Sequence, residues 1–273
     1  MTLDETLQDI KKATTDMWHK GWTEANGGNI TVRLDHGISK DIEVVTAGQW
    51  LKLPRPCPKL AGELLFATGA GQHLRNIEIS PEGNGGIIEL SDDGRAYRMI
   101  WGFKNDIKPT SELPTHLFTH EEIKTTAVGS PKVLIHCHAP NLIALSYLME
   151  LDSNILSKLL WLMQTECLVI FPKGVGFLPW MAPGTEEIGY QSAKLLKKRP
   201  LLLWQYHGIL ATGSTLDEAF GRIHVAEKTA EIFLKVKACA PSFKHISNQQ
   251  LEILSRRFNS DIDRDILNTI LPL

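Results

Sequence analysis

The stretch Val133-Leu134-Ile135-His136-Cys137-His138-Ala139-Pro140-Asn141 places two histidines at the end of an apolar run. Such a run, closed by a proline, is typical of a buried β-strand, in which side chains alternate between two faces. We therefore expect His136 and His138 on one face and Cys137, as a structural residue, on the other. Two neighbouring imidazoles at a strand end suit a divalent transition metal that keeps open positions for substrate. The alternative is two unrelated histidines, one of them buried and hydrogen-bonded.

A third imidazole is available from His207, which lies in the apolar run 201–210 directly before Gly208. A lone histidine in a core strand is usually a buried, hydrogen-bonded residue. With His136 and His138, however, His207 completes a three-histidine set drawn from two predicted strands, as a catalytic zinc site requires.

His116 and His120 are a further candidate pair, spaced four residues apart on one face of a predicted helix. This spacing can bind a metal when a suitable carboxylate pattern accompanies it. No such pattern is present, so we interpret the two side chains as exposed or locally hydrogen-bonded.

Length and composition are those of an ordinary globular protein. The chain has 273 residues, enough for a substantial core, and without repeats or linkers we predict one domain over 1–273. A formal net charge of −2 gives no support for a nucleic-acid or anionic-membrane partner. No apolar run reaches transmembrane length, and the first residues lack the pattern of a secretory signal. Four scattered cysteines predict reduced, mostly buried thiols in a cytoplasmic protein, and a small apolar core residue is the preferred interpretation of each: Cys57, Cys137, Cys167 and Cys239.

Hydrophobic periodicity predicts an alternation of helices and strands. The helices are expected over 3–19, 114–123, 141–151, 185–199, 215–238 and 247–258, and the strands over 30–34, 64–67, 133–138, 165–172 and 201–210. Asp92-Asp93-Gly94 between two apolar runs predicts a hairpin over 86–103. Thr185 is the expected cap of one helix, and Thr215 and Ser247 open capping boxes. Mixed elements with hairpin-like connections favour an antiparallel α/β fold over a Rossmann fold.

Two glycine turns are candidate anion sites. Asn26-Gly27-Gly28-Asn29 precedes a strand, and its glycines let backbone N–H groups approach a phosphate, with Asn29 adding a side-chain donor. A tight turn that needs positive φ explains the glycines equally well. Thr68-Gly69-Ala70-Gly71 is a second such turn at a strand end, with a hydroxyl.

Two carboxylates are candidates for chemistry. Glu112 follows Thr110 and Ser111 at a predicted helix start, where hydroxyl caps and exposed N–H groups also bind anions. Taken alone, an acid at this place is explained by the helix dipole. Glu166 lies near the start of the predicted strand 165–172, and its alternative is a surface carboxylate at a strand edge.

Five motifs follow one another along the chain: Asn26-Gly27-Gly28-Asn29, Thr68-Gly69, Thr110-Ser111-Glu112, His136-Cys137-His138 and His207-Gly208. This ordered series resembles the class II aldolase/adducin-like family of zinc-dependent sugar-phosphate aldolases and epimerases. The likeness extends from about residue 10 to residue 258. Five stretches support one branch, which acts on a ketose 1-phosphate: 20–22, 109–114, 141–145, 178–181 and 215–220. Of these, the Thr-Ser-Glu-Leu-Pro stretch in 109–114 and the Pro-Trp-Met stretch in 178–181 narrow the resemblance to that branch. The resemblance implies a single three-layer α/β/α domain with a mainly antiparallel central sheet, and a cyclic homotetramer with active sites at subunit boundaries.

Residue by residue, the resemblance implies one zinc ion (Zn2+) per subunit, held by His136, His138 and His207. It implies that Glu112 is the catalytic acid/base and Glu166 a second carboxylate beside the aldehyde-derived half of the substrate. The residues implied to hold the phosphate of a phosphorylated ketose are Gly28, Asn29, Thr68, Gly69, Thr110 and Ser111. Some relatives carry His-His-Gly where this chain has Tyr206-His207-Gly208, so no role is transferred to the residue before the ligand.

The chemistry implied is reversible carbon–carbon cleavage. A metal held by three neutral imidazoles acts as a Lewis acid, and a positioned acid/base contributes roughly 10²–10⁴-fold in rate. No lysine is singled out for the Schiff-base route. Two alternatives stay open: another sugar-phosphate aldolase or 4-epimerase of the same family, or a non-catalytic binding module like the adducin head, which resembles this fold but lacks the metal ligands.

Overall fold

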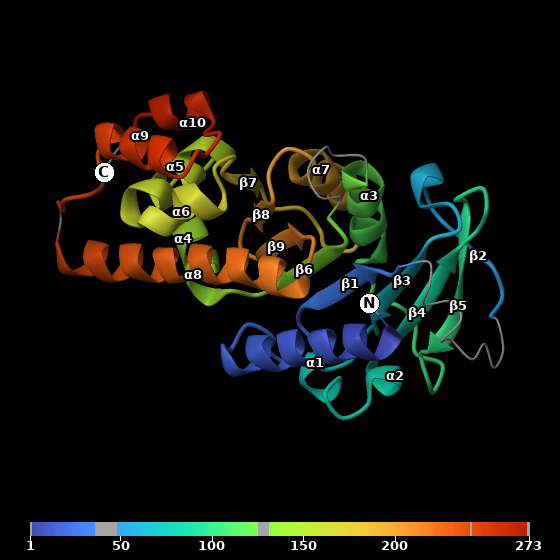
Figure 1. The fold of residues 1–273 in the computed structure, drawn as a ribbon. Coiled ribbons are helices and arrows are strands. Elements are labelled where there is room, and N and C mark those ends of the chain that lie inside the picture. The colour runs from blue at the N-terminus through green and yellow to red at the C-terminus, as the bar shows by residue number, and fades with distance from the viewer. Residues whose placement is uncertain (1, 36–47, 125–130, 241, 272–273) are drawn as a thin grey trace.

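The computed structural model describes residues 2–35, 48–124, 131–240 and 242–271 (Figure 1). Within these ranges nine strands form one sheet, in the order β2-β5-β4-β3-β1-β6-β9-β8-β7. Every neighbouring pair is antiparallel except β7 and β8, so the predicted mainly antiparallel sheet is confirmed. The strands are β1 (Asn29–Arg33), β2 (Leu51–Lys52), β3 (Leu64–Thr68), β4 (Gly85–Leu90), β5 (Ala96–Gly102), β6 (Val133–Cys137), β7 (Val175–Leu178), β8 (Leu201–Trp204) and β9 (Gly208–Gly213).

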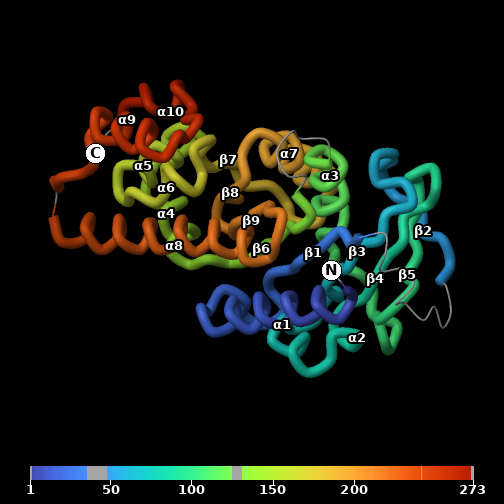
Figure 2. The backbone as a smooth tube through the Cα atoms, in the orientation of Figure 1, coloured from blue at the N-terminus to red at the C-terminus, as the bar shows by residue number. Residues whose placement is uncertain are grey.

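Helices cover both faces of this sheet and give it three layers (Figure 1). They are α1 (Leu3–His19), α2 (Pro81–Asn84), α3 (Leu113–Ile123), α4 (Pro140–Leu148), α5 (Ser153–Met163), α6 (Thr165–Ile170), α7 (Glu186–Leu196), α8 (Leu216–Cys239), α9 (Asn248–Arg257) and α10 (Arg264–Asn268). Figure 2 shows α1 and α8 side by side, and an ion pair of 2.9 Å joins Lys12 to Asp217 between them.

The alternation of side chains along β6 assigns its residues to two cores. Ile135 and Cys137 lie in the large core beneath α1, α4, α5 and α8, whereas Leu134 lies in the core that includes α7. His136 therefore faces the side of the sheet on which α3 and α7 pack, and Cys137 faces away from it, as predicted.

Helix ends follow the expected capping chemistry at several places. Thr185 accepts a hydrogen bond at the start of α7, and Ser247 and Gln250 form a complete capping box at α9. At α8 the Thr215 side chain accepts from the Glu218 N–H, but the Glu218 carboxylate accepts from the backbone N–H of Ser214 instead of Thr215. The predicted box there is thus displaced by one residue.

Three local predictions are wrong. The stretch 165–172 is not a strand: residues 165–170 form helix α6, with Cys167, Leu168 and Phe171 buried at helical spacing. The run 201–210, predicted as one strand interrupted at His207-Gly208, is two strands joined by a turn over 205–207, so His207 lies in the turn and Gly208 begins the second strand. At α3 the N-cap is Glu112 itself, and neither Thr110 nor Ser111 caps the helix.

The four cysteines are free, as expected, and three are buried, but Cys239 is exposed at the end of α8, contrary to the prediction. Among the described residues, no helix is long and apolar enough to span a bilayer. The prediction of one domain covers residues outside the described ranges and stays a prediction.

Candidate active site

Three histidines converge from two places in the fold. β6 ends in His136 and Cys137 and is followed at once by His138, while the turn between β8 and β9 supplies His207. Their ligand nitrogens lie within 4.8 Å of one another. The ring centroids are 4.9–5.2 Å apart, so the predicted set of three is assembled in space.

Two glycines allow this approach. A Cβ at Gly208 would lie 2.5 Å from the carbonyl oxygen of Cys137 and 2.9 Å from Cε1 of His136. A Cβ at Gly27 would lie 2.8 Å from Nδ1 of His138. Contacts this short have no room for a side chain, so both glycines are required by the packing of the imidazoles.

The turn that carries His207 is held by its neighbours. Trp204 pairs with Gly208 across the hairpin, and its ring stacks on that of His207 with centroids 5.0 Å apart. Tyr206 has φ +61°, a conformation that is costly for a residue with a side chain. Its backbone N–H donates to Oγ of Ser146 at 3.1 Å, which helps to hold the turn in place.

Burial keeps two of the three histidines in the form that binds a metal. Desolvation lowers the pKa of His136 to about 3 and that of His207 to about 4, so both are neutral near pH 7. Metal ligation requires the neutral imidazole. The site therefore needs no proton release from these two side chains on binding.

Hydrogen bonds to Nδ1 leave the Nε2 atoms of two ligands for a metal. Nδ1 of His136 donates to the carbonyl oxygen of Ile209 at 3.2 Å, and its buried Nε2 has no hydrogen-bond partner among the described residues. Nδ1 of His138 lies 2.6 Å from Oε1 of Glu24. Partners of this kind fix the tautomer and orientation of metal-binding histidines, so the residues present fit a bound divalent metal.

Glu112 lies beside the cluster. Its carboxylate is buried, with Oε2 3.7 Å from Nε2 of His136 and Oε1 3.9 Å from Nε2 of His207. Nδ2 of Asn29 donates to Oε2 at 2.8 Å. A carboxylate this close to a candidate metal site can exchange a proton with a molecule bound there.

The predicted phosphate-binding residues are gathered next to Glu112. Oγ1 of Thr68 accepts from the N–H of Ile30 at 3.1 Å, and the N–H of Thr110 donates to the carbonyl oxygen of Thr68 at 2.9 Å. Gly69 forms a β-bridge with Pro109.

The remaining two predicted phosphate residues flank this group. Gly28 has φ +81°, the conformation that favours glycine, and precedes Asn29 directly. Ser111 is exposed between Thr110 and Glu112.

Glu166 is not brought to the site. It is exposed on α6, a helix that packs against α5, α8 and α9. Among the described residues, no hydrogen bond or ion pair joins it to Glu112 or to the three histidines. Because its predicted position rested on a strand that is a helix, its role stays a prediction.

His116 and His120 are neither exposed nor metal-binding in arrangement. Both are fully buried on α3, and both contact the hydroxyl of Thr31, at 2.7 and 2.8 Å. The prediction that these side chains are exposed or locally hydrogen-bonded is therefore wrong. They form hydrogen bonds to a strand that is far away in the sequence.

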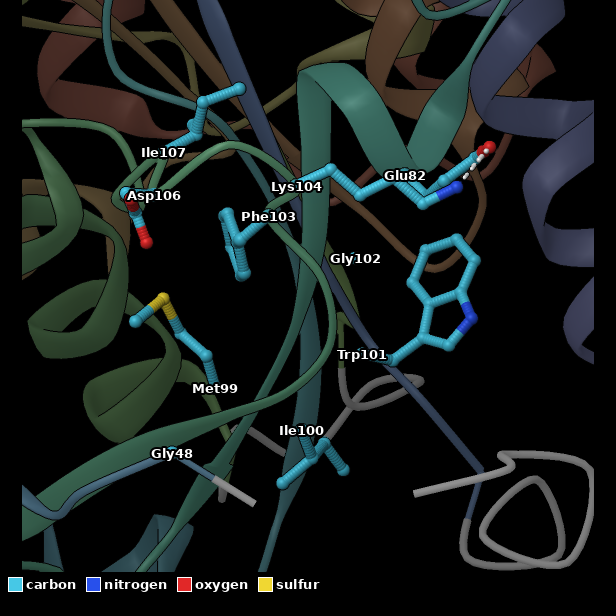
Figure 3. Close-up of a pocket in the computed structure, with 10 residues that line it drawn as sticks. All are labelled: Gly48, Glu82, Met99, Ile100, Trp101, Gly102, Phe103, Lys104, Asp106 and Ile107. Atoms are coloured by element: carbon cyan, nitrogen blue, oxygen red, sulfur yellow. Dashed lines mark hydrogen bonds and ion pairs between the residues drawn. The ribbon is translucent and has the colours of Figure 1, made fainter. Parts of the chain in front are cut away.

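A separate cavity of about 610 Å³ lies along β5 and the loop that follows it (Figure 3). It is flanked by Met99, Trp101 and Phe103 and by the ion pair between Lys104 and Glu82, 3.1 Å long. None of its lining residues is a histidine of the cluster or Glu112, so the cavity is distinct from the candidate site.

Glu24 and Trp204 are site residues that the sequence alone did not indicate. Glu24 contacts a histidine that is 114 residues away in the chain, and no motif spacing connects the two. Trp204 had a weak signal, since it ends the apolar run immediately before the turn that carries His207.

An α/β fold with a mainly antiparallel sheet, three clustered imidazoles and an adjacent buried carboxylate is typical of a metal-dependent enzyme with acid/base chemistry. A profile of the family described as class II aldolase and adducin N-terminal domain matches residues 8–234. The chain therefore belongs to this family of class II aldolases and adducin N-terminal domains.

Individual relatives agree with this assignment. The chain is similar to the rhamnulose-1-phosphate aldolase of Klebsiella pneumoniae, 45% identical over 93% of this chain and 92% of that protein. The enzyme of the same name from an Enterobacter species is 46% identical over 92% of each chain. The crystal structure of a sugar-phosphate aldolase from Thermotoga maritima matches with a TM-score of 0.75 and 29% identity, over 87% of this chain and 97% of that one.

Proposed function

We propose that this protein is a zinc-dependent aldolase that reversibly cleaves L-rhamnulose 1-phosphate to dihydroxyacetone phosphate and L-lactaldehyde, in rhamnose catabolism. The observation that carries the proposal is the buried Glu112 carboxylate 3.7 Å from Nε2 of His136, within a cluster that fits a metal. The substrate is supported by the names of relatives 45–46% identical over more than nine tenths of the chain.

Glu112 is the acid/base in this proposal. In the direction of synthesis it removes a proton from the carbon next to the carbonyl of dihydroxyacetone phosphate, and in the direction of cleavage it returns that proton. Such a positioned group is worth roughly 10²–10⁴-fold in rate. Its burial beside the cluster keeps water away from the carboxylate and holds it close to the reacting carbon.

His136, His138 and His207 are the proposed metal ligands. A divalent cation at this place supplies a Lewis acid that stabilises negative charge developing on the substrate's oxygens. Zinc is the metal that the family resemblance and a three-histidine ligand set support.

The phosphate is proposed to bind where β1, β3 and the residues before α3 meet. Gly28 offers a backbone N–H group there, and Ser111, Thr68 and Thr110 offer hydroxyls. Gly69 lies in the same place, but its N–H donates to the carbonyl oxygen of Asn84 at 2.8 Å. Asn29 offers an amide hydrogen, because Glu112 takes only one of the two that Nδ2 carries.

A homotetramer with active sites at subunit boundaries is the assembly that the family resemblance supports. Glu166 is exposed on α6, and in the described part of its own chain no hydrogen bond or ion pair joins it to the histidine cluster. Its proposed role therefore requires a subunit boundary that brings it to the cluster of a neighbouring subunit. Free cysteines, three of them buried, fit a cytoplasmic enzyme.

The test is to incubate the zinc-loaded protein with L-rhamnulose 1-phosphate and to couple dihydroxyacetone phosphate release to its enzymatic reduction. We expect cleavage of this substrate at a kcat/KM well above that for L-fuculose 1-phosphate or L-ribulose 1-phosphate, both of which would release the same product. A preference for one of the other two would reassign the substrate. Interconversion of epimers without release of dihydroxyacetone phosphate would point to an epimerase, and absence of both bound metal and turnover would support a binding module.

A further inference from the structure

A chain of buried polar groups runs from Glu112 into the space between β1 and α3. Oδ1 of Asn29 lies 2.5 Å from Nε2 of His116. Nδ1 of His116 lies 2.7 Å from Oγ1 of Thr31, which also lies 2.8 Å from Nε2 of His120. All four side chains beyond Glu112 are less than a tenth exposed. A series of buried polar groups destabilises the fold unless each group has a hydrogen-bond partner. This requirement constrains which atoms in the series carry hydrogens.

The donors in this chain can be assigned from valence alone. An ionised carboxylate only accepts, so Asn29 must face Glu112 with its amide nitrogen and His116 with its oxygen. An amide oxygen also only accepts, so Nε2 of His116 must carry the hydrogen. Burial lowers the pKa of His116 to about 3, so its ring is neutral and Nδ1 is left without a hydrogen.

The same logic fixes the two groups behind His116. Nδ1 of His116 accepts, so the Thr31 hydroxyl donates its single hydrogen to it, and the hydroxyl oxygen then accepts from Nε2–H of His120. Nδ1 of His120 is consequently unprotonated, which agrees with its having no hydrogen-bond partner among the described residues. Every donor thus points toward Glu112, from His120 through Thr31, His116 and Asn29.

We infer that His116 is a positioning residue for the acid/base, locked by Thr31 and His120 in the Nε2–H tautomer. In this tautomer it holds the Asn29 amide with its nitrogen toward Oε2 of Glu112. Oε1, which lies 3.9 Å from Nε2 of His207 and beyond hydrogen-bond distance, is left for proton exchange with the substrate. The inference rests on the proposed function in taking Glu112 as the acid/base.

The opposite tautomer shows why the lock matters. With the hydrogen on Nδ1, His116 would present a bare Nε2 to Asn29, and the amide would turn its nitrogen toward the ring. Its oxygen would then face the Glu112 carboxylate, so two acceptors would meet in a buried space. Such a contact repels the carboxylate from its place beside the metal ligands.

Two substitutions of His116 distinguish loss of the Nε2–H donor from loss of the imidazole ring. In His116→Gln the amide nitrogen can take the place of Nε2–H, whereas in His116→Asn the shorter side chain reaches only the place of Nδ1. We expect His116→Asn to lose roughly 10–100-fold in kcat, as for other residues that orient a ligand or catalytic group, and His116→Gln to keep most of it. Zinc content should equal that of the parent in both. Equal losses in the two variants, or parental kcat in His116→Asn, would overturn the inference.

A second pair of variants tests whether Thr31 fixes the tautomer, and leaves the His116 side chain unchanged. Thr31→Val removes the hydroxyl that fixes the tautomer, and Thr119→Val removes a buried hydroxyl of α3 that has no partner among the described residues. Thr31→Val should lower kcat more than it changes KM, while Thr119→Val should leave both unchanged. An equal response of the two would contradict the inference.

The tautomer itself is measured by ¹⁵N NMR of histidine-labelled holoenzyme, and this readout is independent of turnover. We expect His116 to show a protonated Nε2 and an unprotonated Nδ1, and this pattern should be lost in Thr31→Val. A protonated Nδ1 in the parent protein would refute the inference. If instead Glu112→Gln kept full activity, the proposed function would fail while the tautomer assignment stood.

Discussion

Nδ1 of His138 and Oε1 of Glu24 are 2.6 Å apart, a contact between the end of β6 and the turn before β1. The carboxylate makes Nδ1 the hydrogen-bearing nitrogen and leaves Nε2 for the metal. The same turn continues into Gly27, whose lack of a side chain allows His138 to pack against it. One short segment thus both makes room for the imidazole and selects its tautomer.

Replacing this carboxylate should weaken the metal site without removing a ligand. Outer partners of metal-binding histidines are typically worth about 10–100-fold in affinity. The Glu24 side chain is 68% exposed, so for Glu24→Gln we expect a loss near the lower end of this range. Competition with a chromogenic chelator measures it. Glu252→Gln, at a partly buried carboxylate on α9 that pairs with Arg264, is the control. A parental affinity in Glu24→Gln would show that the contact does not orient the ligand.

Gly208 should not tolerate even a methyl group. Its Cβ would meet the backbone oxygen of Cys137 at 2.5 Å, so Gly208→Ala must displace the strand end or the His207 turn. We expect a loss of about 1–3 kcal/mol in unfolding free energy, typical of overpacking, together with reduced metal affinity. Urea unfolding and metal titration measure both.

Gly221 provides the matched control for that substitution. It lies within α8, and a Cβ there has nothing within 4 Å. Gly221→Ala should stabilise the protein by up to about 1 kcal/mol through helix propensity and leave metal binding unchanged. Equal behaviour of the two alanine variants would argue against a packed metal site around Gly208.

Acid should destabilise the fold through the two buried histidines of α3. Burial lowers the pKa of His116 to about 3 and that of His120 well below its ordinary value of 6.5. Below about pH 6.5 the unfolded chain therefore binds protons on these histidines that the folded chain does not. The stability that comes from keeping them neutral is fully present above about pH 6.5 and is lost progressively as the pH falls toward 3. Each such group contributes a slope of about 1.4 kcal/mol per pH unit.

Removal of one of these groups should flatten the dependence. Unfolding free energies of His120→Gln, measured in metal-free buffer between pH 6 and pH 4, should fall less steeply than those of the parent by about 1.4 kcal/mol per pH unit. His245→Gln, at an exposed position, should keep the parental slope. Unchanged slope in His120→Gln would mean that His120 is protonated in the folded protein.

Glu227 should matter for stability because it caps α4 from another helix. Its buried carboxylate accepts from the backbone N–H groups of Asn141 and Leu142 and from the Asn141 side chain, at 2.7–2.9 Å. Glu227→Ala leaves these donors unpaired, at a cost of about 1–3 kcal/mol. Since α4 begins two residues after His138, metal affinity should fall as well. Glu231→Ala, one turn further along α8 and only partly buried, should cost under about 0.5 kcal/mol in urea unfolding, because its ion pair with Lys235 is at the surface.

Much of the fold follows from local sequence signals. The hairpin at Asp92-Asp93-Gly94 and the helices capped by Thr185 and Ser247 appear where short-range chemistry predicts them. The stretch 165–170 does not, because a short apolar run fits a buried strand and a buried helix equally well. Its helical burial pattern depends on packing against α5, α8 and α9, which no local signal contains.

The site shows the same division between local and distant information. His136 and His138 are predictable because their residue type and strand-end position are themselves the signal, and His207 because it lies in an apolar run directly before a glycine. Glu24 was missed because it reaches His138 only through the folded chain. The burial of His116 was missed because its partners, Asn29 and Thr31, lie on a strand more than eighty residues away in the sequence.

The central claim is that Glu112 performs the acid/base step beside a metal that it does not hold. The most direct measurement is zinc content and dihydroxyacetone phosphate release from L-rhamnulose 1-phosphate on one preparation of Glu112→Gln. We predict parental zinc content with turnover reduced at least about 100-fold. Parental turnover in that zinc-loaded preparation would contradict the claim.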